Sequence, residues 1–252
     1  MKVLATYNIK GGVGKTATVV NLSYVCAMEG ARTLVWDLDP QGAATFYFRV
    51  RPKVKGGGKA LLREKRDLDS QVKGTDFDNL DLLPADFSYR NMDLVLDNQK
   101  KPTRRLERVL DQVRNDYDYV FLDCPPGITL ASENVFHASD ALLVPLIPTT
   151  LSARTLEQLG DFIEDRKDGD KRLRKLRLLP FFSMVDVRKR MHMEMLESLP
   201  NTSAGFLHTH IKALTDVERM GVHRQPVPAF APSSPATTAY EELWQEVRTA
   251  VG

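Results

Sequence analysis

The sequence predicts an α/β fold in which a mostly parallel, twisted sheet carries helices on both faces. Short apolar runs, often rich in β-branched residues, alternate with helical or polar stretches along the chain, as is typical of a buried parallel sheet. Polar or glycine-rich segments directly follow three of these runs, and ligands bind at the carboxyl ends of strands in such sheets. The expected strands are Val3–Tyr7, Thr33–Trp36, Leu80–Leu83, Tyr119–Leu122, Ala141–Ile147, Leu176–Met184 and Phe206–Ile211.

Length and composition are typical of one compact domain. The chain has 252 residues, 42% of them hydrophobic, which is enough for a substantial core, so we expect a single domain over residues 1–252. Its two cysteines, Cys26 and Cys124, form neither a disulfide framework nor a spaced metal cluster. The first residues lack an export signal, and no segment approaches the roughly 18 apolar residues of a membrane span. These features predict a soluble, cytoplasmic protein.

A glycine-rich loop between the first strand and a helix-like apolar segment is the most informative motif. It reads Lys10-Gly11-Gly12-Val13-Gly14-Lys15-Thr16. Glycines let consecutive backbone N–H groups turn toward phosphate oxygens, a lysine neutralises the β- and γ-phosphates, and a hydroxyl binds Mg²⁺. Lys15 and Thr16 supply the last two groups, so the expected cofactors are ATP and Mg²⁺. The general phosphate-loop pattern begins with a glycine where this chain has Ile9, and Lys10 is an additional lysine.

Two further motifs follow strand-like runs in the same way. Asp37-Leu38-Asp39-Pro40-Gln41-Gly42 comes after the second run, and Asp123-Cys124-Pro125-Pro126 comes after Tyr119–Leu122. Taken together, the three motifs resemble the deviant Walker A, D-x-D-P-Q-G and Walker B boxes of the ParA/MinD family of ATPases, in order and spacing over roughly the first 150 residues. The resemblance implies a P-loop NTPase fold and Mg-dependent ATP hydrolysis.

The resemblance also implies a role for each residue of the site. Lys10 would reach across a nucleotide-sandwich homodimer into the partner's phosphates, and Asp39 would orient the attacking water. Asp37 and Asp123 would lie near Mg²⁺ together with Thr16, and Gly127 would be a hinge that senses the γ-phosphate. The loop residues Gly11, Gly12, Val13, Gly14 and Ala17 would contact the nucleotide, and Pro228 would lie near the adenine.

Small partition proteins of this family bind DNA without sequence preference, as dimers, through Lys and Arg of the C-terminal half. The net charge here is only +2, so a DNA-binding surface must be local. The expected DNA-binding residues are Arg188, Lys189, Arg190, Lys212, Arg219 and Arg224. The resemblance therefore also implies that the protein associates with the nucleoid, and that a ParB-like or cargo adaptor protein stimulates its ATP hydrolysis. A second basic run, Lys171 to Arg177, is open between a solvated helix face and a DNA surface.

Proteins with other functions share this fold, and the sequence argues against each of them to a different degree. A MinD-like membrane-associated ATPase is the main alternative, but the expected C-terminal helix Tyr240–Arg248 has an acidic polar face, so no membrane partner is expected and Trp244 should be buried. A nitrogenase-type iron protein would need cysteines after the Walker B strand, and a biosynthetic ligase would not need the D-x-D-P-Q-G box. The segment Arg49–Gly74, with three consecutive glycines and nine basic residues, is expected to be a mobile insertion.

Overall fold

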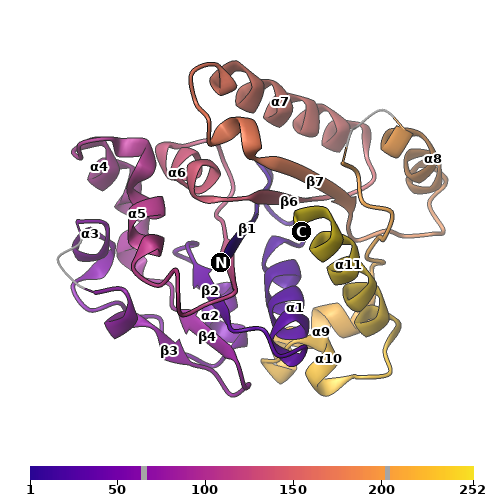
Figure 1. The fold of residues 1–252 in the computed structure, drawn as a ribbon. Helices are drawn as coiled ribbons and strands as arrows, with labels where there is room; N and C mark the ends of the chain where they lie inside the picture. Colours follow the sequence, from indigo (N-terminus) through magenta and orange to yellow (C-terminus); the bar gives the residue numbers. More distant parts are fainter. Residues whose placement is uncertain (64–66, 202–204) are drawn as a thin grey trace.

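The computed structural model describes residues 1–63, 67–201 and 205–252, and these form a seven-stranded sheet with helices on both faces (Figure 1). The strand order is β3-β4-β2-β5-β1-β6-β7, and every neighbouring pair is parallel except β3 and β4. The predicted fold class is therefore confirmed. The strands are β1 (Lys2–Thr6), β2 (Thr33–Asp37), β3 (Lys73–Gly74), β4 (Leu80–Leu83), β5 (Tyr119–Asp123), β6 (Ala141–Leu146) and β7 (Arg177–Phe182).

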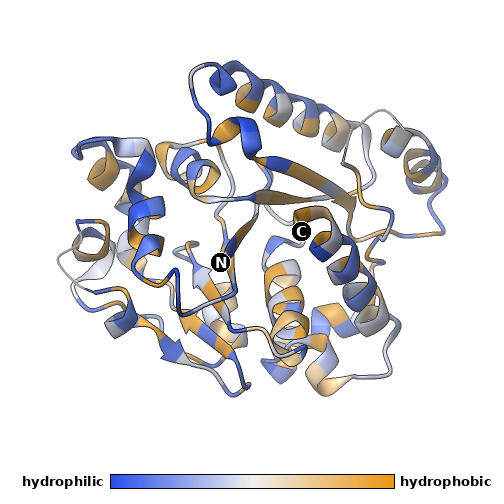
Figure 2. Ribbon diagram, viewed as in Figure 1, coloured by the Kyte–Doolittle hydropathy of each residue, from blue (hydrophilic) through white to orange (hydrophobic). Residues whose placement is uncertain are grey.

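Helices connect the strands and cover the sheet. The α-helices are α1 (Lys15–Met28), α2 (Ala43–Tyr47), α3 (Gly57–Leu62), α4 (Met92–Asp97), α5 (Arg105–Asp111), α6 (Leu130–Ala138), α7 (Thr150–Lys167), α8 (Arg190–Ser198), α9 (Thr215–His223), α10 (Val227–Phe230) and α11 (Pro235–Val251). Short 3₁₀ turns are η1 (Asp69–Gln71), η2 (Phe87–Asn91), η3 (Pro102–Arg104), η4 (Leu173–Lys175) and η5 (Leu199–Asn201). The outer helix α7 shows the expected division into a hydrophobic side toward the sheet and a hydrophilic side away from it (Figure 2).

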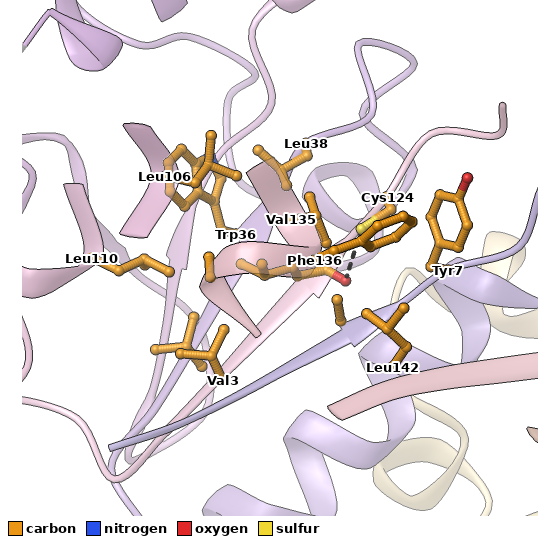
Figure 3. Packing of buried hydrophobic residues seen from close by; sticks show 14 of the residues in the cluster. Val3, Tyr7, Trp36, Leu38, Leu106, Leu110, Cys124, Val135, Phe136 and Leu142 are labelled. Atoms are coloured by element: carbon orange, nitrogen blue, oxygen red, sulfur yellow. Dashed lines mark hydrogen bonds between the residues drawn. The ribbon is translucent and has the colours of Figure 1, made fainter. Parts of the chain in front are cut away.

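The sheet separates two hydrophobic cores because successive side chains of a strand point to opposite faces. Val3 and Ala5 of β1 face one core, which contains residues of α3 to α7, and Leu4 faces the other, which contains residues of α1, α2 and α9 to α11. Figure 3 shows the first core, where Tyr7, just after β1, lies beside Phe136 of α6. Their rings meet edge to face, with centroids 4.9 Å apart. The sheet that carries the predicted phosphate loop is thus held by a hydrophobic core on each of its faces.

One predicted strand, Phe206–Ile211, is wrong. Leu207 and Ile211 donate backbone hydrogen bonds to carbonyls of β7, so the segment runs beside that strand. Between them, the backbone N–H groups of His208 and Thr209 donate to the carboxylate of Glu246 on α11. The Glu246 carboxylate thus accepts hydrogen bonds that a neighbouring strand would otherwise accept, so no regular β-ladder forms here.

The segment Arg49–Gly74 is built into the first core, contrary to the expected mobile insertion. Val54, Leu61, Leu62 and Leu68 are buried there, and Leu61 and Leu62 lie on α3. Three of the residues that suggested an insertion, Glu64, Lys65 and Arg66, lie outside the described residues. Hydrophobic residues spaced among the charges, and not the charges themselves, determine how this segment packs.

Two further expectations concern helices. The second basic run, after α7, forms the short turn η4 and the start of β7 and therefore no helix face. At the C-terminus, the expected helix is present as α11, and Trp244 is 1% exposed, as predicted. No helix within the described ranges is long and apolar enough to cross a membrane.

Candidate nucleotide-binding site

The glycine-rich loop lies between the carboxyl end of β1 and the amino end of α1. Gly12 and Gly14 have left-handed backbone angles, with φ of 72° and 87°, which a residue with a Cβ adopts only with strain. A Cβ on Gly14 would also come within 2.7 Å of the Ser183 hydroxyl, so glycine is required there for two reasons. No side chain caps the first turn of α1. Its free N–H groups and the positive end of the helix dipole are therefore available to an anion.

Two side chains, those of Asn8 and Lys15, set the shape of this loop. Asn8 donates from Nδ2 to the carbonyl of Pro145 on β6, and its Oδ1 accepts from the backbone N–H of Lys10. The Nζ of Lys15 donates to the Lys10 carbonyl over 3.0 Å, and its side chain is buried. Burial lowers the pKa of Lys15, although the negative charge of Asp123 acts in the opposite direction. The lysine is thus held inside the loop where phosphate charge would lie.

Asp123 is the strongest indication of a metal ion. It ends β5 beside Asp37, which ends the neighbouring strand β2. The side chain of Asp123 is completely buried, and neither carboxylate oxygen has a hydrogen-bond partner among the described residues. Burial, and then repulsion from Asp37, raise its pKa well above the ordinary value, and the nearby Thr16 hydroxyl offsets this only in part. A buried carboxylate without a partner is costly unless a cation or its bound water satisfies it, so the residues fit Mg²⁺ held by Thr16 and Asp123.

Asp37 has a different environment. Its Oδ2 accepts hydrogen bonds from the backbone N–H and the hydroxyl of Thr45, at 2.8 and 2.7 Å, and its Oδ1 accepts from the N–H of Asp39. Burial raises the pKa of Asp37 to about 6, although the hydrogen bonds from Thr45 lower it. The visible role of Asp37 is therefore to hold the first turn of α2 at the edge of the site. Its predicted place near Mg²⁺ agrees with its position beside Asp123, and its role there stays a prediction.

A pocket of about 600 Å³ opens in front of the loop. Binding sites for small ligands commonly have this size. Asp39 lies at its edge and accepts a hydrogen bond from the N–H of Gln41, which closes a tight turn. The lining residues are Gly11, Gly12, Gly14, Lys15, Thr16, Ala17, Asp39, Pro40, Gln41, Ala43, Tyr47, Pro125 and Pro126. Seven residues predicted to form the site from the sequence thus converge here.

The loop after β5 is tied to the segment that leads into the phosphate loop. Gly127 donates from its backbone N–H to the Ile9 carbonyl over 3.1 Å, and its own carbonyl accepts from the Tyr7 hydroxyl over 2.9 Å. Its φ of 101° requires glycine. One residue is therefore held through both of its backbone polar groups, and the hinge expected at this position stays a prediction.

Five predicted site residues do not line the pocket. Lys10 is half-buried at the base of the loop, and Val13 is buried beneath it. Asp37 and Asp123 are buried at the strand ends, as described above. Pro228 belongs to the short helix α10. The proposed adenine contact of Pro228 stays a prediction.

The residues predicted to bind DNA form two groups. Arg188, Lys189 and Arg190 lie at the start of α8, and an isolated β-bridge brings Lys212 beside Val185 of the same region. The other two lie on α9 and at its C-terminal end, and α9 packs against α2. Arg219 pairs with Asp216 on α9, and Arg224 donates to the Phe46 carbonyl with its guanidinium 4.5 Å from the Phe46 ring centroid.

Acids neutralise part of the first group. Arg188 makes a two-point ion pair with Asp186, and Arg190 pairs with Glu194 at 2.7 Å. Lys189 and Lys212 are exposed and make no ion pair with the residues that the structure describes. The field of this surface is therefore weaker than its sequence suggests.

Sequence reasoning missed the supporting residues Tyr7, Asn8, Thr45, Tyr47 and Ser183. Tyr7 binds Gly127, Thr45 binds Asp37 and Ser183 lies against Gly14, which in each case is a contact between residues apart in sequence. Tyr47 lines the pocket. Only Asn8 had a local signal, since a short polar side chain two residues before Lys10 commonly accepts a backbone N–H.

Comparison with known proteins identifies the family. Residues 1–175 match the model of a family described as an AAA domain, AAA_31. The chain is 29% identical to the sporulation initiation inhibitor protein Soj of Bacillus subtilis over 98% of both chains. It is 27% identical to a ParA family protein of Chlamydia muridarum, over 98% of this chain and 97% of that one.

The fold is also found in a solved structure. The cobyrinic acid a,c-diamide synthase of Mycobacterium smegmatis with bound ADP and magnesium superposes with a TM-score of 0.82. The two are 27% identical, and the match covers 97% of this chain and 93% of the synthase. Because this family model matches more than half of the chain, the chain belongs to the AAA_31 family of AAA domains, and its relatives include proteins named Soj and ParA.

Proposed function

We propose that this protein is an ATP-dependent dimerising switch that binds DNA without sequence preference and hydrolyses ATP when a partner protein stimulates it. Such a switch would segregate DNA or position a cellular cargo. The observation that carries the proposal is the phosphate loop itself: Lys15 is enclosed within it, whereas the additional Lys10 does not line the pocket of its own subunit.

The pocket supports ATP and Mg²⁺ as ligands. The N–H groups of the loop and of the first turn of α1 would bind the phosphates, and Lys15 would neutralise them. Thr16 and Asp123 would hold Mg²⁺, which would supply charge neutralisation at the β- and γ-phosphates. Asp39 lines the same pocket, and we assign it the orientation of the attacking water.

Dimerisation would complete the site. Phosphoryl transfer needs a positive group that stabilises charge on the γ-phosphate and the bridging oxygen, and a residue of a second protein can supply it. We assign this role to Lys10 of the partner subunit. Conformational change at Gly127 would then link the state of the nucleotide to the surface of the dimer.

The alternative of a MinD-like membrane-associated ATPase receives little support from α11. Tyr240, Leu243, Trp244 and Val247 are all buried against the second core, so this helix has no free apolar face. A helix that binds a membrane presents its apolar face to lipid.

Two lysine substitutions test the proposal. Lys15→Ala should lose nucleotide binding, because it removes the cation inside the loop. Lys10→Ala should keep nucleotide binding by the monomer but lose ATP-dependent dimerisation and stimulated turnover. Nucleotide affinity is measured with a fluorescent ATP analogue, and mass in solution by light scattering with ATP and Mg²⁺. Lys189→Ala, an exposed lysine far from the loop in sequence, is the matched control, and a normal ATP dimer in Lys10→Ala would refute the role of Lys10.

A further inference from the structure

Positive charge is concentrated in two short segments, residues 100–108 and 166–177. Together they contain twelve Lys and Arg against three Asp and Glu, a net charge of +9. The whole chain carries +2, so the remaining residues carry −7. Neither segment includes any of the six residues expected above to bind DNA, and the run from Lys171 to Arg177 is the one whose role the sequence leaves open.

The fold brings these two segments together. Arg104 of η3 pairs with Asp170 at 3.0 Å, and Arg172 lies 3.2 Å from Glu107 of α5. Asp170 also contacts the Nε2 of His137 on α6 over 3.1 Å. These inner acids pair with the inner arginines and fix the two segments relative to one another. We call the resulting surface, residues 100–108 with 166–177, the basic end.

The outer cations of the basic end remain available. Lys171, Arg174 and Lys175 are exposed, and none of them makes an ion pair in the part of the chain that the structure describes. With Arg104 and Arg172 they line a surface pocket of about 360 Å³ whose lining is entirely basic. Figure 2 shows hydrophilic residues over the turn that follows α7. The other exposed cations of the basic end are Lys100, Lys101, Arg108, Arg166 and Arg177.

The basic end lies far from the nucleotide pocket along the sheet. Asp140 and Arg177, which mark the amino ends of β6 and β7, are joined by a backbone hydrogen bond, and Arg172 lies 3.8 Å from Asp140. The phosphate loop follows the carboxyl end of β1, which is parallel to β6. The two sites are thus at opposite ends of the sheet, and closure of a dimer over the nucleotide pocket would leave the basic end uncovered.

We propose that the basic end is a second DNA-binding surface, which binds the phosphate backbone whether or not nucleotide is bound. Several flexible cations on one face are what sequence-independent phosphate binding requires, and Arg matches phosphate geometry well. None of the large exposed hydrophobic side chains lies in either segment, so the surface lacks the apolar anchor of a membrane-binding element. This inference rests on the DNA binding proposed above, but it assigns a different surface and a different dependence on ATP.

The test compares two triple variants with the same change of charge. One is Lys171→Glu/Arg174→Glu/Lys175→Glu, and its matched control is Arg188→Glu/Lys189→Glu/Arg190→Glu. Binding of a fluorescent DNA duplex is measured by anisotropy, without nucleotide and with ATP and Mg²⁺. The wild type should bind DNA without nucleotide. In that state the basic-end variant should lose affinity about ten-fold or more, and the control should lose clearly less affinity than the basic-end variant does. For the basic-end variant, a plot of log affinity for DNA against log salt concentration should also be less steep than for the wild type. The slope should change by about 0.9 for each phosphate that the variant no longer neutralises.

Other outcomes would overturn the inference. If DNA binding needs ATP and fails only in the control variant, the surface at α8 binds DNA, and the proposed function stands without the basic end. If the wild type binds no DNA in either state, both the inference and the DNA-binding part of the proposed function fail. Binding to vesicles of phosphatidylserine or to polyglutamate, with no binding to DNA, would assign the basic end to a different polyanion. Thermal unfolding and nucleotide affinity like those of the wild type show that each variant is folded.

Discussion

At the scale of single residues, the chemistry of the site depends on side chains outside the motifs. Tyr7 is completely buried, and its hydroxyl holds the carbonyl of Gly127 on the loop that follows Asp123. Its ring contacts Phe136 of α6, so it is anchored on one side and bound to the loop on the other. Tyr7 can therefore position this loop without touching the nucleotide.

We expect Tyr7→Phe to lower the basal rate of ATP hydrolysis while the KM for ATP changes little. The substitution keeps the ring packing but removes the hydrogen bond to Gly127, and the phosphate contacts come from another segment. Stability should fall by about 1 kcal/mol, the usual contribution of one such bond. Steady-state kinetics and urea unfolding measure the two effects. Tyr24→Phe is the control, because the structure shows no partner for the Tyr24 hydroxyl among the described residues, and equal kinetics in both variants would remove the positioning role.

The sequence predicts the residues of the phosphate loop well because glycine, lysine and threonine are needed there for local reasons. It predicts less about Asp37 and Asp123, which look alike in sequence. Asp37 is hydrogen-bonded to Thr45, whereas Asp123 has no hydrogen-bond partner among the described residues. Only the packing of α2 distinguishes the two aspartates. Arg188 and Arg190 were expected to be free cations, but nearby acids pair with them. Such pairing depends on side-chain direction, which composition does not reveal.

At the scale of helices and strands, alternation of apolar residues predicts the buried strands, and it fails where a side chain replaces a strand. Phe206 and Leu207 are buried like strand residues, yet Glu246 binds the N–H groups that follow them. The two-residue strand β3 is too short to leave any pattern. In each case, the deciding contact comes from a part of the chain that is distant in sequence.

Glu246→Gln should destabilise the protein by about 1–3 kcal/mol, because a charged acceptor of two backbone N–H groups is removed. Limited proteolysis should also cleave within residues 206–211 faster than in the wild type. Urea unfolding followed by tryptophan fluorescence measures the first effect. The control is Glu241→Gln, an exposed acid on the same helix. An equal loss of stability in the two variants would show that Glu246 does not hold this segment.

Asp170 joins η3, α6 and η4 and gives stability a dependence on pH. Burial works to raise its pKa, but hydrogen bonds from the Arg172 N–H and the Arg104 guanidinium lower it to about 2. Because the folded pKa is below the ordinary value of 3.8, the unfolded state takes up a proton first as the pH falls. The stabilisation is therefore complete above pH 3.8 and is lost as the pH falls toward 2.

Asp170→Asn should accordingly cost stability near neutral pH, and the difference from the wild type should shrink below pH 3.8. Urea unfolding at a series of pH values gives the free energy of unfolding for both proteins. Asp168→Asn, at an exposed neighbouring acid, should show no such trend. A difference that stays constant down to the lowest accessible pH would mean that the native pKa of Asp170 is not depressed.

At the scale of the whole molecule, nucleotide state is expected to control assembly. Asp39→Ala should accumulate a long-lived ATP dimer, because Asp39 is assigned to the attacking water and not to nucleotide affinity. Light scattering over time after addition of ATP and Mg²⁺ follows the dimer, and removal of Mg²⁺ with EDTA should disperse it. Asp67→Ala, at an exposed acid, should turn over ATP as the wild type does. Normal hydrolysis in Asp39→Ala would contradict the assignment.

The place of β1 in the sheet has a consequence for how the chain is made. β1 lies between β5 and β6, so its partners are translated more than a hundred residues after it. During synthesis, the nascent chain carries a hydrophobic strand with two unpaired edges, which invites association with other chains. The phosphate loop gains the wall of its pocket only when Pro125 and Pro126 have emerged from the ribosome. The complete pocket, and with it full nucleotide binding, is therefore available only after about half of the chain has been made.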